Sequence, residues 1–324
     1  MSEPATAPYE AEILMRVDQR RSVADHVLAL TLVPVDNSAL PRWAPGAHID
    51  LLLPCGLTRQ YSLCGDPADR ERWTVAVLRE HNGRGGSQFL HDQVAVDATV
   101  SVRGPRNQFP LVKAESYVLI AGGIGITPIL PMVRELAAAG ADWHLHYGGK
   151  RRSSMAFRAE LERIDAQRVR VYAEDEVGLI DLEPLLGGSD AATAVYCCGP
   201  APLLDAVAAH CANRPAEALH VESFVPRDVD ESAGDLRSFE VELARSGVTV
   251  SVSPDASVLD VVEAAGIPVR SSCREGICGT CETTVLAGEV DHRDSLLTRA
   301  EREANATMFI CVSRARTRSL TIDL

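Results

Sequence analysis

Residues 271–284 read SSCREGICGTCETT and place three cysteines within nine residues. These are Cys273, Cys278 and Cys281, and the next cysteine, Cys311, follows after 29 intervening residues. The pattern C-x4-C-x2-C with a distant fourth cysteine is the plant-type spacing for a [2Fe-2S] cluster held by four thiolates. The sequence therefore predicts that these four cysteines bind a one-electron carrier near the end of the chain.

The rest of the loop suits a cluster as well. Gly276 and Gly279 allow a tight wrap, because no Cβ separates the backbone N–H groups from the sulfurs. Arg274 and Thr280 could add further hydrogen-bond donors. Structural zinc is one alternative, but zinc sites usually pair their cysteines in short knuckles, whereas here three cysteines share one loop. Unligated cysteines are the other alternative.

Length, composition and charge exclude several classes of protein. The chain has 324 residues, enough for two or three domains, and a net charge of −13, which argues against nucleic acid as a partner. No run approaches the ~20 apolar residues of a membrane helix. The N-terminus lacks a basic region followed by an apolar one, so no secretory signal is predicted. We therefore expect a cytoplasmic protein that binds no membrane.

Nine cysteines in one chain need an explanation. Their number is odd, and a reducing cytoplasm does not favour a disulfide framework. Five of them stand outside the cluster pattern, in or beside apolar runs, which favours small core residues. These five are Cys55, Cys64, Cys197, Cys198 and Cys211.

Secondary-structure patterns divide the remaining chain. Residues 10–112 hold short apolar strands separated by turn residues, with one short helix near 89–94, which predicts an antiparallel barrel or sandwich. From Tyr117 onward, apolar strands alternate with helical segments, which predicts a parallel sheet with right-handed crossovers. Residues 225–237 are polar and acidic and have the character of a linker.

The last segment, which contains the cysteine loop, has its own pattern. A hairpin is predicted around Ser246 and Gly247, followed by a helix over 257–266. After the cysteine loop, residues 307–324 again have the character of strand. From 238 to 324 there are 13 acidic residues, 9 arginines and no lysine, so this segment is weakly acidic.

Glycines mark a candidate nucleotide site. Gly122, Gly123 and Gly125 follow an apolar strand and open a helix, the context that a dinucleotide site requires. Pro128 stands where the third glycine of the Rossmann pattern would be, and proline suits the first turn of a helix. The alternative is a plain strand–helix turn. The basic turn Lys150–Arg152 could meet a 2′-phosphate, or could simply be solvated.

Two stretches of the first segment are candidates for a flavin site. In RQYSLCGDP, Arg59 offers a fork for a phosphate, Tyr61 a flat face and Ser62 a hydroxyl. Further on, NGRGGSQFL supplies a glycine turn that leads into a short helix and could cradle a phosphate. Each stretch, taken alone, also fits an ordinary strand end and loop.

The motifs of this chain, and the order in which they occur, resemble those of the phthalate dioxygenase reductase family, which includes vanillate demethylase reductase subunits. Along the chain they are RQYSL, GRGGS, GGIGITPI, CCGP, VESF and the cysteine loop. The resemblance runs from about residue 10 to the end. It implies a multidomain fold with four parts: an antiparallel β-barrel that binds FMN (1–112), an α/β parallel-sheet domain that binds NAD(P) (113–226), a linker (227–237) and a plant-type [2Fe-2S] ferredoxin domain of the α+β, β-grasp type (238–324).

The resemblance also implies site residues. FMN, rather than FAD, would contact Arg59, Gln60, Tyr61, Ser62, Ala76, Val77, Leu78, Gly85, Gly86, Ser87 and Phe224. NADH or NADPH would contact Gly122, Gly123, Gly125, Thr127, Cys198, Gly199 and Pro200. The four cysteines would ligate the cluster, and no acid–base residue is needed.

The expected activity is electron transfer. A hydride carries two electrons and a [2Fe-2S] cluster takes one, so a flavin is expected to convert between the two modes. The family implies a separate terminal oxygenase as the transient partner, either a Rieske-type oxygenase or a cytochrome P450. One alternative is a self-contained reductase of a small molecule such as a quinone. Another is a redox-sensing or structural metal module without catalysis.

Overall fold

A computed structural model describes residues 12–54, 56–187, 192–226 and 237–324. Contacts divide the chain into two compact units, 1–221 and 222–324. Cys55 and nearly all of the expected linker 227–237 lie outside the described residues. None of the helices in the described parts is both long and apolar enough to cross a membrane.

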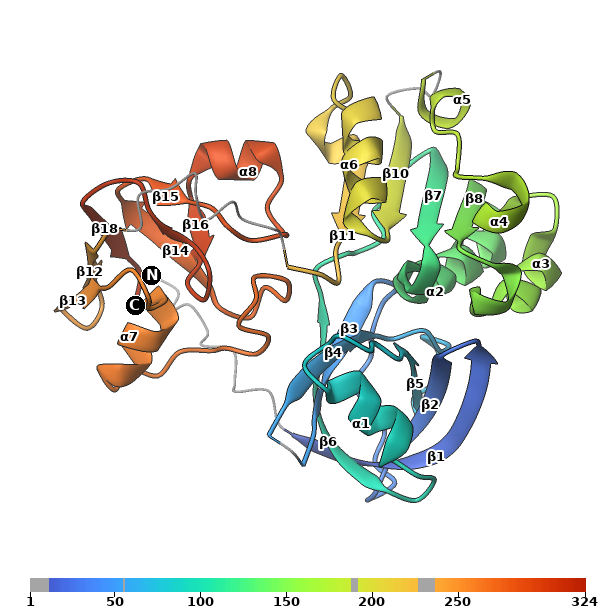
Figure 1. The fold of residues 1–324 in the computed structure, drawn as a ribbon, viewed down its shortest axis with the longest axis horizontal. Helices are drawn as coiled ribbons and strands as arrows, with labels where there is room; N and C mark the ends of the chain where they lie inside the picture. Colours follow the sequence, from blue (N-terminus) through green and yellow to red (C-terminus); the bar gives the residue numbers. More distant parts are fainter. Residues whose placement is uncertain (1–11, 55, 188–191, 227–236) are drawn as a thin grey trace. The chain divides into compact units, whose positions relative to one another are not determined.

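The first part of the first unit is an antiparallel barrel, as expected (Figure 1). Its strands run in the sheet order β4-β3-β6-β1-β2-β5. Their bounds are β1 (Ile13–Ala24), β2 (Val27–Pro34), β3 (Ala47–Leu52), β4 (Thr58–Ser62), β5 (Trp73–Leu78) and β6 (Thr99–Asn107). The predicted short helix is present as α1 (Gly86–Asp92), and its Leu90 packs on the barrel core.

The barrel forms because its strands alternate in character. Along β3, Ile49 and Leu51 face the barrel core, while His48 and Asp50 face the other side of the sheet. The edge strands β4 and β5 meet through one isolated bridge, between Leu63 and Val75. This bridge nearly closes the sheet on itself.

The second part of the first unit contains the predicted parallel sheet, in the order β11-β10-β7-β8-β9. Strands β10, β7, β8 and β9 pair in parallel. The strands are β7 (Ser116–Gly122), β8 (Asp142–Gly149), β9 (Val169–Ala173), β10 (Thr193–Cys198) and β11 (Leu219–Glu222). The helices are α2 (Ile126–Ala138), α3 (Arg158–Asp165), α4 (Glu174–Val177), α5 (Glu183–Leu186) and α6 (Ala201–His210), with short 3₁₀ turns η1 (Gly123–Gly125), η2 (Arg152–Ser154) and η3 (Ala216–Ala218).

Both faces of this sheet are buried, which explains its continuous apolar strands. On β7, Leu119 packs with α2 and α3, whereas Ile120 packs with α5 and α6. Barrel residues such as Ala76 and Phe109 belong to the same core cluster as α2. The barrel and the nucleotide sheet therefore share one hydrophobic core and form a single unit.

The second unit contains a mixed five-stranded sheet in the order β13-β12-β18-β14-β16, and a two-stranded ribbon β15-β17. The strands are β12 (Phe239–Leu243), β13 (Val248–Val252), β14 (Glu282–Ala287), β15 (Val290–Asp291), β16 (Thr307–Phe309), β17 (Arg314–Ala315) and β18 (Ser319–Ile322). Helices α7 (Val258–Ala264) and α8 (Arg299–Ala304) complete it. The predicted hairpin is present, with Gly247 at φ +67°.

Three elements of the second unit were not predicted. Two are strand β14, which begins directly after Cys281, and the short strand β15. The third is α8, which starts with a capping box in which Thr298 and Glu301 satisfy each other's backbone N–H groups. That sequence signal was available, because a threonine followed three residues later by glutamate marks a helix start.

Candidate functional site

The four cysteines of the predicted cluster come together in the second unit. Each is at most 9% exposed. The Cys273 thiol lies within hydrogen-bonding reach of the Cys278 and Cys311 thiols, and Cys311 is within the same reach of Cys281. Residues far apart in the sequence thus form one compact set of sulfur donors.

Backbone N–H groups surround these sulfurs. The Glu275 amide lies 3.3 Å from Cys273 Sγ, and the Thr280 amide 3.4 Å from Cys278 Sγ. The Gly276 N–H also bonds to the Cys311 sulfur. Gly276 has φ +69°, a conformation that glycine adopts without strain, which lets the loop turn its amides inward. The loop therefore provides the N–H donors that a sulfur cluster needs.

The cysteine spacing bears on the choice between a cluster and a zinc site, because three of the four cysteines share one loop. Four-cysteine zinc needs all its thiolates around one ion, whereas a [2Fe-2S] cluster distributes four cysteines over two irons. The plant-type spacing of the four cysteines therefore favours the cluster.

Thr280 and Arg274, both expected to donate hydrogen bonds to the cluster, differ in role. Thr280 Oγ1 lies 3.2 Å from Cys278 Sγ, so it is placed to bond the sulfur. Arg274 instead pairs with Asp260 at 3.0 Å and with Glu263, both on α7. Arg274 therefore anchors the loop to the helix.

The candidate nucleotide residues also meet, at the carboxyl edge of the parallel sheet. A Cβ on Gly125 would lie 2.2 Å from the carbonyl oxygen of Cys198, and one on Gly122 would lie 2.6 Å from Pro200 Cδ. The chain crosses to β8 on one side of β7, while β10 lies on the other side. Ligands of open α/β sheets bind at such a switch point.

Two of the predicted nucleotide residues point their side chains inward. Thr127 is 2% exposed and donates its hydroxyl to the Ile124 carbonyl at 3.0 Å. The Cys198 side chain is fully buried. These residues shape the turn, whereas Gly199 and Pro200 retain exposed surface.

The basic turn after β8 is engaged in ion pairs. Arg152 Nε lies 2.7 Å from Glu176 Oε2, and Arg151 Nε lies 3.9 Å from Asp175 Oδ2. Both carboxylates come from α4, which follows β9. This arrangement fits the interpretation of the turn as a solvated surface feature.

The candidate flavin residues line a seam in the barrel. Beyond the Leu63–Val75 bridge, continuing the antiparallel register sets Gln60–Ser62 of β4 opposite Ala76–Leu78 of β5, and Arg59 just beyond the end of β5. Each of these strands is paired with a neighbour only on its other edge. Strand edges of this kind offer backbone N–H and C=O groups to a ligand.

The predicted phosphate residues lie at one end of the seam. A Cβ on Gly86 would lie 2.6 Å from Arg59 Cγ and Nε, so the arginine stem rests on the start of α1. Gly85 has φ +84° and precedes the helix. Ser87 Oγ accepts a hydrogen bond from the Glu80 amide at 3.0 Å, which closes the intervening loop.

Two buried polar atoms lie on β3 and β4, beside the seam. Ser62 Oγ and His48 Nε2 are buried, with no hydrogen-bond partner among the described residues. The two residues are cross-strand neighbours on β4 and β3. A buried polar group without a partner costs roughly 1–3 kcal/mol, so a polar ligand is expected here. Ser62 Oγ and His48 Nε2 are therefore candidate contacts for a ligand.

The residues around His48 were not identified from sequence. Asp50 is 1% exposed, pairs with Arg106 at 2.6 Å and accepts a hydrogen bond from Gln60 at 3.0 Å. Tyr61 points to the opposite face of β4 and packs on the barrel core. The available signal was the polar alternation of His48 and Asp50 in a strand that is otherwise apolar.

Acid should destabilise the barrel through His48. Burial, with help from nearby Arg106, lowers the pKa of His48 to about 4, and Asp50 opposes this shift. The unfolded chain then binds the proton more tightly, so stability is lost as the pH falls from 6.5 toward 4. We expect a loss of about 2 kcal/mol between pH 7 and pH 5 from this group. Urea unfolding followed by flavin fluorescence measures it, and equal losses in the parent and in His48→Gln would contradict it.

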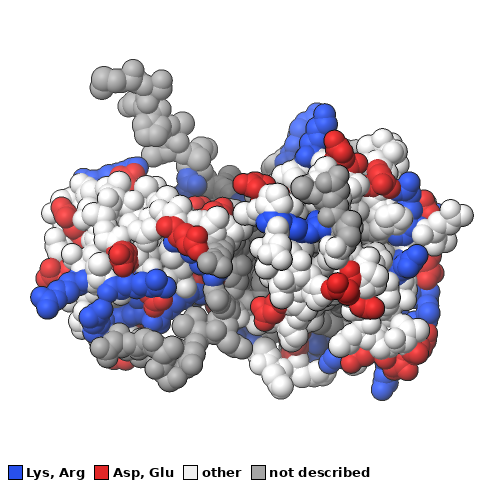
Figure 2. All heavy atoms as spheres, turned by 90° about the horizontal axis from the view of Figure 1, so that it is seen from above, with Lys and Arg blue, Asp and Glu red and all other residues white. Residues whose placement is uncertain are grey.

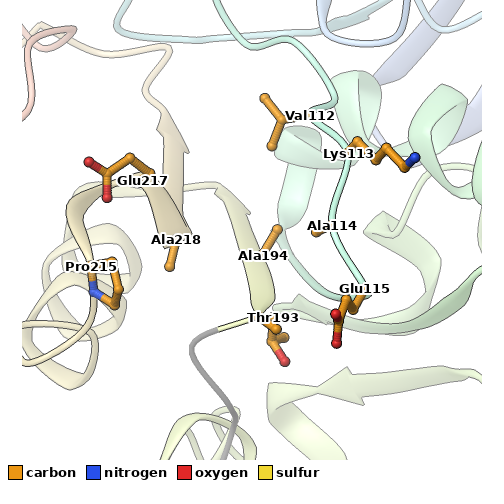
Figure 3. A pocket seen from close by; sticks show the side chains of 10 residues that line it. Val112, Lys113, Ala114, Glu115, Thr193, Ala194, Pro215, Glu217 and Ala218 are labelled. Atoms are coloured by element: carbon orange, nitrogen blue, oxygen red, sulfur yellow. The ribbon is translucent and has the colours of Figure 1, made fainter.

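One pocket lies away from these sites. It has a volume of about 480 Å³ and is lined by residues such as Glu115, Thr193 and Pro215 (Figure 3). Glu115 immediately precedes β7 and Thr193 begins β10, so the pocket lies at the amino ends of these strands. The glycine turns are at the opposite edge of the sheet.

Comparisons with known proteins agree with this architecture. Residues 119–209 match the family model of the oxidoreductase NAD-binding domain, and residues 241–316 match that of the 2Fe-2S iron-sulfur cluster binding domain. The second match includes all four cluster cysteines.

Among curated relatives, the chain is 41% identical to the phenoxybenzoate dioxygenase subunit beta of Ectopseudomonas oleovorans, with 100% of both chains covered. It is 38% identical to tetrachlorobenzoquinone reductase of Sphingobium chlorophenolicum, covering 96% of this chain and 97% of the relative.

Among solved structures, phthalate dioxygenase reductase matches with a TM-score of 0.71 and 35% identity, covering 97% of this chain and 98% of the other. An intact type IV self-sufficient cytochrome P450 monooxygenase matches with a TM-score of 0.87 and 46% identity. The match covers 97% of this chain but only 41% of that longer protein.

A flavin-type barrel, a parallel nucleotide sheet and a ferredoxin module in one chain define an electron-transfer flavoprotein reductase. The chain belongs to the phthalate dioxygenase reductase family of oxygenase reductases. It is an NAD(P)H-dependent oxidoreductase that uses a flavin and a [2Fe-2S] cluster.

Proposed function

We propose that electrons enter from NAD(P)H at the β7–β10 edge, pass to FMN in the β4–β5 seam and leave through the cluster. When bound, the flavin takes a hydride as an electron pair and releases electrons singly, as the cluster requires. The observation that carries this proposal is that four buried cysteines with plant-type spacing come together in the second unit.

The chain's own residues bind and orient the two ligands. Arg59 and the turn at Gly85 and Gly86 would hold the phosphate end of the flavin, because the arginine side chain lies against Gly86 at the start of α1. Ser62 would donate to the ring, which would give its buried hydroxyl a partner. Gly123 and the Gly199–Pro200 end of β10 receive the dinucleotide.

Phe224 has a role only through the family resemblance. It lies just beyond β11 in the second unit and is 37% exposed. A partly exposed aromatic ring is available to a flavin. Its place beside the flavin remains part of the proposal.

The proposed acceptor is a separate terminal oxygenase that docks transiently. A relative named as a dioxygenase subunit supports a Rieske-type oxygenase, and the fused P450 structure supports a cytochrome P450. Figure 2 shows acidic and basic side chains interspersed over the face it displays, so docking would use local charge. A cytoplasmic location belongs to this proposal, supported by the free thiols among the described cysteines.

Spectroscopy and turnover test the proposal together. The purified protein should show flavin bands and a broad iron–sulfur shoulder, and NADH or NADPH should bleach both. Adding an oxygenase encoded beside this gene should couple nucleotide oxidation to product formation. Material that stays colourless and iron-free after anaerobic reconstitution would refute the relay.

A quinone reductase is the second candidate function, favoured by the 38% identical relative that is named for that activity. Electrons would then leave directly from the flavin, and the cluster would be an accessory. Turnover with a benzoquinone that survives removal of the cluster would support this candidate. Loss of all protein-acceptor turnover in the same variant would support the oxygenase reductase.

Ser62→Ala tests the flavin seam. Removing the buried hydroxyl should weaken flavin binding about tenfold, the equivalent of one lost hydrogen bond of roughly 1.4 kcal/mol. Flavin titration of the apoprotein by fluorescence quenching measures the affinity. The exposed Ser22→Ala serves as control, and an unchanged affinity in Ser62→Ala would place the ring elsewhere.

A further inference from the structure

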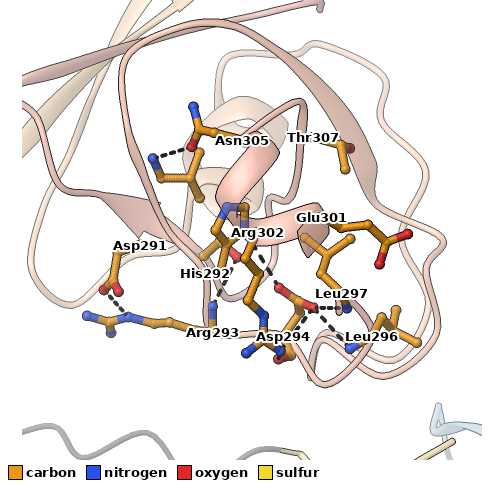
Figure 4. Close-up of polar contacts among 12 residues, drawn as sticks. Asp291, His292, Arg293, Asp294, Leu296, Leu297, Glu301, Arg302, Asn305 and Thr307 are labelled. Carbon is orange, nitrogen blue, oxygen red and sulfur yellow. Dashed lines mark hydrogen bonds and ion pairs between the residues drawn. The ribbon is translucent and has the colours of Figure 1, made fainter. Parts of the chain in front are cut away.

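A buried acidic residue lies behind the cysteine loop. Asp294 is fully buried, between β15 and α8. Its Oδ1 accepts hydrogen bonds from the amides of Leu296 at 3.0 Å and Leu297 at 2.7 Å. Arg302 donates to its backbone carbonyl at 2.9 Å (Figure 4). The side chain thus shapes a tight turn over residues 294–297.

This turn holds one particular residue of the cysteine loop, Gly276. The Ser295 amide donates to the Gly276 carbonyl at 3.0 Å. A Cβ on Gly276 would lie 3.1 Å from Asp294 Cα and 2.7 Å from Val312 Cγ2, so Gly276 is clamped between them. The Gly276 N–H bonds to the sulfur of Cys311. The turn therefore fixes Gly276, the residue whose N–H faces a predicted cluster ligand.

Charged side chains also lie close together around Asp294. The Arg302 guanidinium lies 4.0 Å from Asp294 Oδ1, and His292 Nδ1 lies 3.9 Å from Oδ2. The reduction potential of an iron–sulfur cluster depends on nearby charge and on hydrogen bonds to its sulfurs. A buried carboxylate at this position opposes the arrival of an electron, and the half-buried Arg302 guanidinium favours it.

We propose that Asp294 is a positioning residue for the cluster, which orients the Gly276 N–H through Ser295, and that the Asp294–Arg302 pair sets the cluster's reduction potential. The turn and the charge have separate consequences. An amide at position 294 preserves the turn but removes the charge, whereas alanine removes both.

Opposite charge changes should shift the potential in opposite directions. In Asp294→Asn, the equilibrium constant for one-electron reduction should rise by up to about tenfold, a shift of about +59 mV. In Arg302→Gln it should fall by a similar factor. Redox titration monitored by the EPR signal of the reduced cluster measures both. Exposed Asp255→Asn is the matched control and should leave the potential unchanged.

Loss of the turn should show as loss of the cluster. Asp294→Ala should release iron to a strong chelator about tenfold faster than the parent, whereas Asp294→Asn should stay within about twofold of it. If Asp294→Ala fails to take up the cluster while Asp294→Asn loads it, the positioning role is supported. An unshifted potential in both Asp294→Asn and Arg302→Gln, or equal iron release in all variants, would overturn the proposal.

The inference rests on the cysteine ligands of the proposed function, and the parent protein separates the two failures. A parent without the EPR signal of a reduced [2Fe-2S] cluster refutes the ligand assignment. A parent with that signal, and variants with unchanged potentials and iron release, refutes only the role of Asp294.

Discussion

Cys278→Ala is expected to abolish electron transfer to protein acceptors. Cys278 is 2% exposed and lies within reach of the Cys273 thiol, so its loss removes one of four ligands from a closed set. Cytochrome c reduction should fall by more than roughly 100-fold, because ligand loss costs at least as much as loss of a supporting contact. Ferricyanide, which takes electrons from the flavin, should be reduced within about twofold of the parent rate.

The matched control is Cys211→Ala, which removes another buried thiol at α6, far along the sequence from the cluster loop. This variant should keep the EPR signal of the reduced cluster and the cytochrome c activity. If Cys278→Ala kept both, the sulfur assignment would be wrong. If Cys278→Ala reduced neither cytochrome c nor ferricyanide, flavin binding would depend on the presence of the cluster.

Gly125→Ala is expected to block hydride transfer. Gly125 has φ −59°, so alanine adds no backbone strain, but its Cβ would lie 2.2 Å from the Cys198 carbonyl oxygen. The ends of β7 and β10 must then separate, and a misplacement of about 1 Å can cost about 100-fold in rate. Anaerobic stopped-flow bleaching of the flavin by NADH or NADPH measures the effect, with dithionite as a reductant that needs no nucleotide site.

Gly140→Ala serves as the control, because there alanine strains the backbone but meets no steric clash. Gly140 has φ +65°, and a Cβ there meets nothing within 4 Å. This substitution should cost about 1–2 kcal/mol of stability through the left-handed conformation, without slowing flavin reduction. Equal rates in Gly125→Ala and the parent would place the dinucleotide away from this turn.

Local patterns in the chain predicted much of the architecture. Alternating and continuous apolar runs predicted the antiparallel barrel and the parallel sheet, and Ser246–Gly247 predicted the hairpin of the second unit. Cys64, Cys197, Cys198 and Cys211 are buried, as expected of small core residues. Helix α8 was missed although its capping box stands in the sequence, because a short polar helix has little hydrophobic periodicity.

The seam site depended on information that no local pattern contains. Ser62 and His48 meet because β3 and β4 pair in one register, and a slip of one residue would turn them to opposite faces. Asp50 and Arg106 likewise form an ion pair because the register between β3 and β6 brings them together. Single-strand patterns report which face a residue occupies, but not which residue lies opposite.

The sequence alone determined the chemistry of this protein, because the cysteine spacing and the glycine turns specify backbone conformations that few other functions require. Only the tertiary structure decided which distant groups act together: Gly125 against Cys198, Arg59 on Gly86, and Asp294 behind Gly276. The physical reason is that donors and ligand spacing are properties of a short segment, whereas contacts across a seam or a sheet edge depend on strand register and crossover.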